Sequence, residues 1–493
     1  MEYRYNRTKV TSPEPEEDES ISAPRVGLLG IPVELREQVY AELLDSSSSS
    51  DLCRLLRTCR QIYEEARRFL YKRPLIFASQ NAFFDWVDRV ADRTLLCNVH
   101  TLKLKVVAPS AQSLEAFFLR RLHSADHHDP GETPESQDAR QFISRLRLFS
   151  GLKHLAILRY TERDIEPKDE IIVSIFAFIR KNMALSFDSL TLHDHKMPLT
   201  FLPDFQNLRT FNFTGFSVAE PEDALAKLSQ LPKLEELILV GPPPELQFHQ
   251  RTGCRGRRVV QSITPEVMAS LRPLRALSLH ELRDDMFPGL KFFTAEMLNA
   301  VRDTHARSLR HLSLQTNQFL AQQSLSPSGS SYYGFNNSSG TDVLRSIRSL
   351  LREAARSLET VSLAWYDLDA DIFHFVLSSS SSSLKHLEVS LPAHDTRRSH
   401  AIVSTLVQLQ RLNCFPSLRS VVLKYYTARD PVSTPKGFMP TPSRATGQRT
   451  RPPLMDVEIE PALAAWLEMN RQRLRELGLR VDACRWELGY EDV

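Results

Sequence analysis

Cysteine is scarce in this sequence, and the cysteines that are present never stand close together. The six are Cys53, Cys59, Cys97, Cys254, Cys414 and Cys484. No two of them form a C-x-x-C pair, whereas a structural zinc site needs ligands grouped at such short spacings. We therefore expect reduced, mostly buried thiols and no zinc site.

An excess of either charge is also missing. The 493 residues include 62 Lys and Arg against 60 Asp and Glu, which gives a formal net charge of +2. A chain so close to neutral implies no strongly basic surface. We therefore expect neither nucleic acid nor an anionic membrane as a partner.

Long apolar runs are absent as well. No stretch approaches the roughly eighteen residues that a membrane-spanning helix needs. The first residues, MEYRYNRTKVTSPEPEEDES, are polar and then acidic, with no apolar segment typical of a signal peptide. We expect a cytoplasmic or nuclear protein without a membrane partner.

Motifs that carry catalysis are missing too. The chain has no G-x-S-x-G, no Walker loop and no G-x-G-x-x-G after a strand pattern. A possible metal site consists of His123, His127, His128, Asp126 and Asp129. The Gly and Pro residues around this group favour a solvated loop instead. We expect no catalytic residue, metal or cofactor, and hence a protein that is not an enzyme.

What is present begins with a short helical pattern from Leu28 to Tyr71. Pro32 suits the first position of a helix, and Leu35, Val39 and Leu43 recur every four residues beside Tyr40 and Leu44. Asp51 is a plausible N-cap of a second helix. Thr58 and Gln61 have capping-box spacing for a third helix, whose apolar face is Ile62, Ala66, Phe69 and Leu70.

This stretch resembles the F-box, in the variant common in fungal proteins. The matching residues are Ile31-Pro32, Glu34-Leu35, Val39-Tyr40, Leu43-Leu44, Leu55-Leu56, Cys59-Arg60, Ile62-Tyr63, Glu65-Ala66 and Leu70-Tyr71. The resemblance implies a three-helix module that binds a Skp-type adaptor. The adaptor-binding residues it implies are Ile31, Pro32, Leu35, Val39, Tyr40 and Leu43. The alternative is a plain three-helix cap on the following domain.

The pattern L-x-x-L-x-L, with apolar substitutes, recurs through the rest of the chain. Its copies start at Val99, Leu152, Phe187, Leu208, Leu234, Leu274, Leu309, Leu358, Leu384, Leu418 and Leu474. The last two apolar positions alternate with period two and predict a short strand, and amphipathic helices precede many copies. Predicted helices are Ile171–Met183, Asp223–Leu231, Ala295–His305, Asp342–Arg356, His400–Leu412 and Pro461–Arg473, with N-caps at Thr294 and Thr341.

Helix followed by strand, repeated, resembles a leucine-rich-repeat solenoid, although the repeat lengths are irregular. The fold class we expect is α/β: an N-terminal three-helix F-box-like module followed by an irregular leucine-rich-repeat-like array. A generic α/β sheet protein is the alternative. The expected domains are a disordered acidic tail (1–26), the module (27–73) and the array (74–493). The array has loop insertions near 123–138, 242–258 and 324–340 and a disordered insertion at 428–453.

Polar and aromatic side chains follow several predicted strands. The groups are His193, Asp194 and His195, then Trp365, Tyr366 and Asp367, then Tyr425 and Tyr426. Exposed aromatic residues at strand ends favour a protein partner, so these are the candidate target-binding residues. Burial in the core is the alternative for the aromatic ones.

The two resemblances together imply the substrate-recognition subunit of a Skp–cullin–F-box ubiquitin ligase. The module would dock on the Skp-type adaptor and hence the cullin, and the array would hold an unidentified protein target. Such a subunit acts by raising the effective concentration of its target near the conjugating enzyme. A non-catalytic scaffold outside ubiquitin transfer is the alternative, followed by an enzyme whose site the sequence does not reveal.

Overall fold

The computed structural model describes thirteen segments of the chain. They are residues 28–46, 49–106, 134–159, 170–193, 198–241, 260–281, 292–316, 340–365, 368, 370–377, 383–392, 396–426 and 461–486. The expected N-terminal tail and nearly all of the four expected insertions lie outside these residues. Two edges differ from expectation, because residues 134–138 begin helix α6 and Gly340 begins helix α12.

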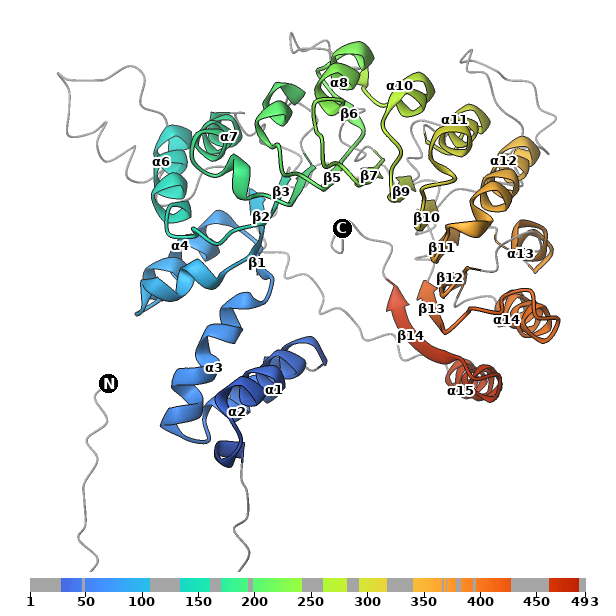
Figure 1. The fold of residues 1–493 in the computed structure, drawn as a ribbon, viewed down its shortest axis with the longest axis horizontal. Helices are drawn as coiled ribbons and strands as arrows, with labels where there is room; N and C mark the ends of the chain where they lie inside the picture. Colours follow the sequence, from blue (N-terminus) through green and yellow to red (C-terminus); the bar gives the residue numbers. More distant parts are fainter. Residues whose placement is uncertain are drawn as a thin grey trace, which may run out of the picture. The chain divides into compact units, whose positions relative to one another are not determined.

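The chain divides into two compact units, Met1–Arg73 and Pro74–Val493. We call them unit 1 and unit 2 and describe each by itself. Unit 1 contains the 3₁₀ helix η1 (Leu28–Gly30) and the helices α1 (Val33–Ser46), α2 (Ser49–Leu56) and α3 (Arg60–Lys72) (Figure 1). Its core consists of Tyr40, Leu56, Ile62, Ala66 and Phe69. Three of these residues lie on the predicted apolar face of α3.

The helix starts in unit 1 differ from the sequence prediction. Helix α2 begins at Ser49, so Asp51 lies inside it. The N-cap of α3 is Cys59, whose side chain makes no capping hydrogen bond. The Thr58 hydroxyl instead donates to the Leu55 carbonyl at 2.7 Å, which completes the end of α2 and makes Thr58 unavailable as a cap for α3.

Unit 2 is an α/β unit with a twelve-stranded parallel sheet. The order is β1-β2-β3-β4-β5-β7-β9-β10-β11-β12-β13-β14, so each strand pairs with the next strand of this sheet in the chain. The strands are β1 (Leu75–Phe77), β2 (Thr101–Val106), β3 (His154–Arg159), β4 (Ser189–His193), β5 (Thr210–Phe213), β7 (Glu236–Val240), β9 (Ala276–Glu281), β10 (His311–Thr316), β11 (Thr360–Trp365), β12 (His386–Pro392), β13 (Ser420–Tyr426) and β14 (Arg480–Trp486). A separate antiparallel pair joins β6 (Phe216–Ser217) to β8 (Val260–Gln261).

Helices connect successive strands of the large sheet. They are α4 (Gln80–Arg89), η2 (Arg93–Asn98), α6 (Pro134–Leu146), α7 (Glu170–Asn182), η3 (Ala184–Ser186), η4 (Leu199–Asp204), α8 (Pro221–Leu228), α10 (Pro265–Ser270), α11 (Ala295–His305), α12 (Gly340–Glu353), η6 (Ala354–Arg356), α13 (Ala370–Leu377), α14 (Thr396–Arg411) and α15 (Pro461–Glu476). Figure 1 shows the helices from α6 to α15 on one face of the sheet. Since helix and strand alternate, neighbouring strands run parallel, as expected for such connections.

The predicted strands are confirmed at 102–104, 155–157, 190–192, 237–239, 277–279, 312–314 and 387–389. Their apolar residues stand in register across the sheet. One continuous row is Leu102, Leu155, Leu190, Phe211, Leu237, Leu277, Leu312, Val361, Leu387, Val421 and Val481. Every member of this row is buried. The repeated apolar pairs therefore form the core between the sheet and its helices.

The strand predicted for the last copy of the pattern, at Leu477 and Leu479, is wrong. Val421 pairs with Val481 and Leu423 with Ala483, so the final strand starts at Arg480, beyond Leu477 and Leu479. Leu474 belongs to α15, which runs on to Glu476. Gly478 then adopts a left-handed conformation with φ of 78°, and the Leu479 N–H returns to the Leu474 carbonyl at 3.2 Å. This helix-ending turn shifts the strand toward the C-terminus.

Candidate functional site

The first candidate surface is an apolar strip on α1 of unit 1. Leu35 is 47% exposed and Val39 is 37% exposed. One helical turn separates these two side chains, so they lie on the same side of the helix. Pro32 is exposed beside them, and Ile31 and Leu43 are half-buried. We call Pro32, Leu35 and Val39 the α1 strip.

Tyr40 differs from the other residues that the F-box resemblance implies for adaptor binding. Its side chain is fully buried, and its ring packs edge-on against Phe69 with centroids 5.7 Å apart. One residue along a helix turns the side chain by about 100°, which takes Tyr40 away from Val39 and toward α3. We therefore place Tyr40 in the core of unit 1 and not on the α1 strip.

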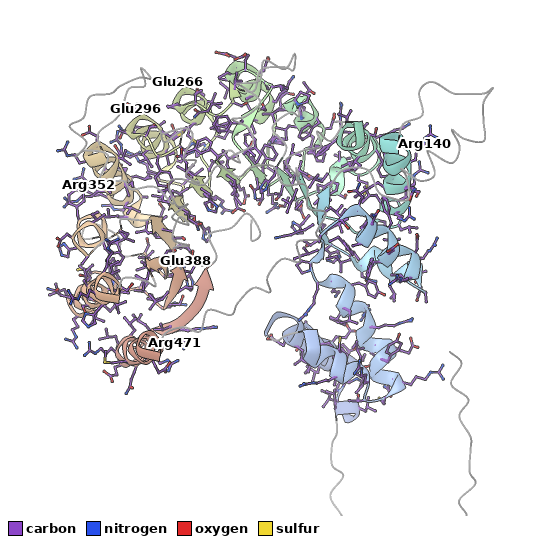
Figure 2. The ribbon with its side chains drawn as sticks, turned by 180° about the vertical axis from the view of Figure 1, so that it is seen from behind. Arg140, Glu266, Glu296, Arg352, Glu388 and Arg471 are labelled. Carbon is purple, nitrogen blue, oxygen red and sulfur yellow. The ribbon has the colours of Figure 1, made fainter. Side chains whose placement is uncertain are left out.

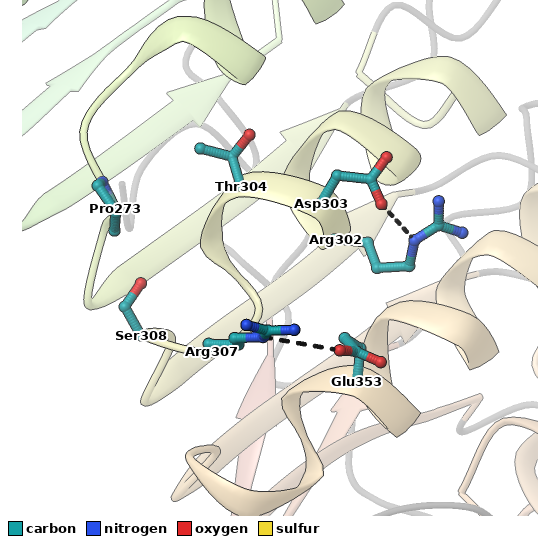
Figure 3. A pocket seen from close by; sticks show the side chains of 7 residues that line it. All are labelled: Pro273, Arg302, Asp303, Thr304, Arg307, Ser308 and Glu353. Carbon is teal, nitrogen blue, oxygen red and sulfur yellow. Dashed lines mark hydrogen bonds and ion pairs between the residues drawn. The ribbon is translucent and has the colours of Figure 1, made fainter.

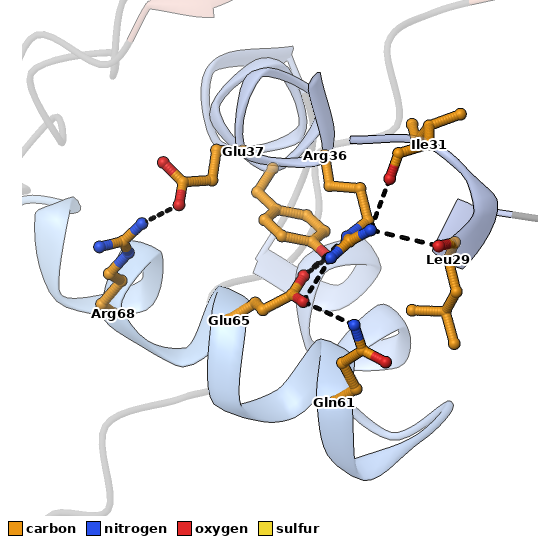
Figure 4. A network of polar contacts seen from close by, with 8 residues as sticks. Leu29, Ile31, Arg36, Glu37, Gln61, Glu65 and Arg68 are labelled. Carbon is orange, nitrogen blue, oxygen red and sulfur yellow. Dashed lines mark hydrogen bonds and ion pairs between the residues drawn. The ribbon is translucent and has the colours of Figure 1, made fainter. Parts of the chain in front are cut away.

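A polar network fixes the other side of α1 to α3 (Figure 4). The Arg36 guanidinium donates from Nε to Oε2 of Glu65 at 2.8 Å and from Nη2 to Oε1 at 2.6 Å. Its Nη1 donates to the Ile31 carbonyl at 2.5 Å and the Leu29 carbonyl at 3.3 Å. Arg36 therefore holds the residues before α1 as well as α3, and this orients the α1 strip.

Glu65 is the centre of this network. Besides Arg36, it accepts from Gln61 Nε2 at 3.0 Å and from the Tyr40 hydroxyl at 3.0 Å. These donors, Arg36 first, lower the pKa of the Glu65 carboxyl to about 2. The carboxylate is thus ionised at any physiological pH. A second ion pair, between Arg68 and Glu37, joins the same two helices.

The second candidate surface is the face of the unit 2 sheet opposite its helices. Residues there alternate with the buried apolar row and are largely polar. Figure 2 shows Glu388 on this side of the sheet, whereas Glu266, Glu296 and Arg352 lie on the helix side. We call it the polar sheet face.

Hydrogen bonds connect five neighbouring strands across the polar sheet face. His280 on β9 lies 3.2 Å from the Ser313 hydroxyl, and Gln315 Nε2 donates to Ser313 and Ser362 at 3.1 and 3.4 Å. Ser362 in turn donates to Glu388 at 2.5 Å, and Lys424 Nζ lies 2.8 Å from the same carboxylate. Residue spacing did not indicate this network, because its members are ordinary polar residues of the strands.

Two histidine rings on this face remain neutral at pH values well below the ordinary pKa of histidine. Burial lowers the pKa of the His193 and His280 rings to about 4 in each case. His193, the last residue of β4, is half-buried and lies 3.4 Å from Asn212 Oδ1. Of the predicted target-binding residues, His193 is thus on the polar sheet face. Asp194 and His195 lie outside the described residues.

The aromatic candidates stand at the ends of strands. Trp365 ends β11, and Tyr425 and Tyr426 end β13. The backbone of Trp365 is in register with Thr316 on β10. Those of Tyr425 and Tyr426 are in register with Leu391 and Pro392 on β12. Tyr366 and Asp367 lie outside the described residues.

A shallow hollow of about 720 Å³ lies on the helix side of unit 2 (Figure 3). Its lining is Pro273, Arg302, Asp303, Thr304, Arg307, Ser308 and Glu353. Arg302 pairs with Asp303 at 2.8 Å, while Arg307 lies 3.9 Å from Glu353 and is 91% exposed. The hollow thus presents one largely solvated guanidinium.

Among the described residues no group of three His, Cys, Asp or Glu side chains is placed to hold a metal ion. The histidines near 123–128 lie outside them. Cys53, Cys59, Cys97 and Cys414 are free thiols. No helix in the described ranges is both long and apolar enough to span a membrane.

No protein-family model matches this chain, and no curated protein is similar to it.

Proposed function

We propose that this chain is the substrate-recognition subunit of a Skp–cullin–F-box type ubiquitin ligase. Unit 1 is then an F-box-like module that docks the Skp-type adaptor, and unit 2 is a leucine-rich-repeat-like array that holds a target protein. The chain supplies no nucleophile in this proposal. It positions the target so that ubiquitin transfer becomes effectively intramolecular.

The observation that carries the proposal is the α1 strip. Leu35 and Val39 remain exposed on a helix whose adjoining side is tied down by Tyr40 and the Arg36–Glu65 pair. A fixed, exposed apolar strip is typical of a surface that a partner covers. Its position on the first helix agrees with the residues that the F-box resemblance implies.

Unit 2 supports the second half of the proposal. Its helix–strand units stack in register, which is how repeat arrays share one core. The hydrogen-bonded polar sheet face offers donors and acceptors on a rigid support, as a protein-binding surface requires.

The adaptor-binding test compares two substitutions on one helix. The purified chain is mixed with a Skp-type adaptor, and binding is measured by calorimetry. Leu35→Asp places a carboxylate in the proposed interface, where an unpaired charge costs several kcal/mol, so we expect binding to be lost. Val33→Asp is the matched control. Val33 is similarly exposed, at 39%, but lies about 200° around the helix from Leu35, so binding should persist.

Controls on folding make this test decisive. Hydrogen exchange in α1 and α3 shows whether unit 1 is still folded in each variant. If Leu35→Asp unfolds unit 1, Leu35→Ala shortens the side chain without adding charge and should weaken binding with the exchange pattern unchanged. Wild-type chain that is folded but fails to bind the adaptor would contradict the proposal.

The alternative is a scaffold that uses the same surfaces outside ubiquitin transfer. Tyr63 on α3 is also strongly exposed, so unit 1 offers an apolar contact besides the α1 strip. A partner protein whose binding to the chain depends on Tyr63 and tolerates Leu35→Asp would favour the scaffold.

A further inference from the structure

The residues that precede the strands of unit 2 form a continuous charged row. Each one after His100 donates its backbone N–H to the carbonyl of the equivalent residue one strand earlier, at 2.7 to 2.9 Å. The row is His100, Lys153, Asp188, Arg209, Glu235, Arg275, Arg310, Glu359, Lys385 and Arg419. We call it the strand-start row. Its side chains follow one another at about 4.8 Å, the spacing of neighbouring strands.

This row is far more basic than the chain as a whole. After His100 it contains six basic and three acidic residues, whereas the chain has 62 basic and 60 acidic residues. The imbalance lies in the second half, where four of the five residues from Arg275 to Arg419 are basic. We call Arg275, Arg310, Lys385 and Arg419 the basic edge.

Acidic neighbours neutralise only part of the basic edge. Glu359 lies 2.9 Å from Lys385 and 3.8 Å from Arg310, and Glu235 lies 3.3 Å from Arg275. Within the described residues, Arg419 forms no ion pair, and its side chain is exposed. The edge thus keeps positive charge facing solvent.

The hollow of Figure 3 adjoins the same edge. Two of its lining residues, Pro273 and Ser308, stand two positions before Arg275 and Arg310 respectively. The exposed Arg307, three positions before Arg310 in the chain, adds a further guanidinium. A ligand on the basic edge would therefore meet both a row of cations and a depression next to it.

We propose that the basic edge binds an acidic, extended segment of a partner protein, one rich in Asp and Glu. From Arg275 to Arg419 the row crosses four strand spacings, about 19 Å, which an extended segment of about six residues covers. Arginine suits this partner because its planar fork donates two parallel hydrogen bonds to a carboxylate. The inference rests on the proposed function, since it names the chemistry of the target that unit 2 would hold.

The interleaved carboxylates favour a peptide over a nucleic acid. Glu359 stands in the middle of the basic edge, and its pKa lies below its ordinary value, chiefly because Lys385 donates a hydrogen bond to it. A uniform polyanion would place negative charge against this carboxylate. A peptide can instead place a neutral or basic side chain there.

The test uses the full chain and two fluorescein-labelled peptides, one of alternating Asp and Ser and one of alternating Asn and Ser. Fluorescence anisotropy should detect binding of the Asp peptide only, and added salt should weaken it. Replacing Arg310 and Arg419 together by Glu should weaken binding by about tenfold or more. Arg352→Glu is the control for Arg419→Glu alone, because it makes the same change of charge on an exposed residue of α12, on the helix side (Figure 2), and it should leave binding unchanged.

Several results would overturn the inference. Equal binding of the Asn peptide, or equal loss with Arg352→Glu, would show a nonspecific effect of net charge. Tighter binding of oligothymidylate through the same arginines would assign the edge to nucleic acid. If the double variant instead lowers the melting temperature without changing peptide affinity, the basic row only balances the negative ends of the helices nearby. If the double variant fails to fold, Arg419→Ala takes its place, and unchanged affinity in that folded variant would count against the basic edge.

The experiments can contradict acidic-peptide binding and the proposed function separately. A chain that binds the adaptor but not the Asp peptide would end this inference alone. A chain that binds the peptide but not the adaptor would end the ubiquitin-ligase proposal and leave the basic edge as an acidic-peptide site.

Discussion

Arg36 on α1 and Glu65 on α3 form a two-pronged ion pair between residues 29 positions apart in the chain. Both side chains are largely shielded from solvent, at 7% and 17% exposure. The pair holds two of the helices of unit 1 together and sets the direction in which Leu35 and Val39 point. The structural role of Arg36 is thus to keep the α1 strip in place.

The pair gives unit 1 a specific pH dependence. Because the pKa of Glu65 is lowered from 4.5 to about 2, the unfolded chain binds a proton that the folded chain does not as pH falls through this window. The contribution of the ionised Glu65 carboxylate to the stability of unit 1 is complete above about pH 4.5 and is lost toward pH 2. The protection factors for hydrogen exchange in α1 and α3, which correct for the slower intrinsic exchange at low pH, should fall across this window in the wild type. In Glu65→Gln, protection should be lower already at pH 6 and change less on acidification.

Tyr40 should act through packing more than through its hydroxyl. Tyr40→Ala leaves a cavity beside Phe69 and should lower the free energy of unfolding of unit 1 by about 3–5 kcal/mol. Tyr40→Phe removes only the hydrogen bond to Glu65 and should cost about 1 kcal/mol. Hydrogen exchange in α3 measures both variants. Equal effects would contradict the placement of the ring in the core.

The histidines of the polar sheet face should make unit 2 sensitive to mild acid. The pKa of each ring is lowered from 6.5 to about 4, so the unfolded chain takes up protons in this window before the folded chain does. The free energy of unfolding should therefore fall between pH 6.5 and pH 4. The titratable groups facing them are Lys103 for His193, and Lys424, Glu388 and His193 for His280.

Tryptophan fluorescence measures this effect in unit 2, because the four tryptophans, Trp86, Trp365, Trp466 and Trp486, all follow Arg73. Denaturant unfolding at pH 7 and pH 5 should show a smaller loss of stability in the double variant His193→Gln, His280→Gln than in the wild type. The control His374→Gln, at an exposed position on α13, should behave as the wild type. An unchanged loss in the double variant would show that other groups cause the acid sensitivity.

Two glycines allow backbone strain to be separated from crowding. Gly215 and Gly478 have similar φ values of 74° and 78°. A Cβ at Gly478 would meet nothing within 4 Å, whereas one at Gly215 would overlap the Phe292 ring at 2.3 Å. Gly478→Ala should cost about 1 kcal/mol in unfolding free energy, and Gly215→Ala should cost distinctly more. Equal costs by tryptophan fluorescence would contradict the packing of Phe292.

The strands of unit 2 could be predicted because their signal is local. Leu277 and Leu279, for example, alternate with polar residues, and this period holds wherever the strand packs. The N-cap Thr294 is equally local and is confirmed, since its hydroxyl accepts from the Met297 N–H at 3.1 Å. Thr341 lies inside α12, which begins one residue earlier, so its assignment as an N-cap was wrong.

The candidate sites could be predicted only in part, because they depend on contacts between distant residues. The four-residue spacing in α1 indicated that Leu35 and Val39 lie together, but it did not show that Tyr40, the residue after Val39, is covered by α3. The strand-start row is likewise invisible in one repeat: Arg310 and Lys385 become neighbours of Glu359 only when the strands stand in register. Pairing between strands therefore created surfaces that residue spacing did not indicate.

The measurement that tests the account most directly is hydrogen exchange on the purified chain with and without a Skp-type adaptor. The account predicts slower exchange in the first turns of α1 on adaptor binding, abolished by Leu35→Asp and retained in Val33→Asp. Exchange that is the same with and without adaptor in the folded wild-type chain would contradict it.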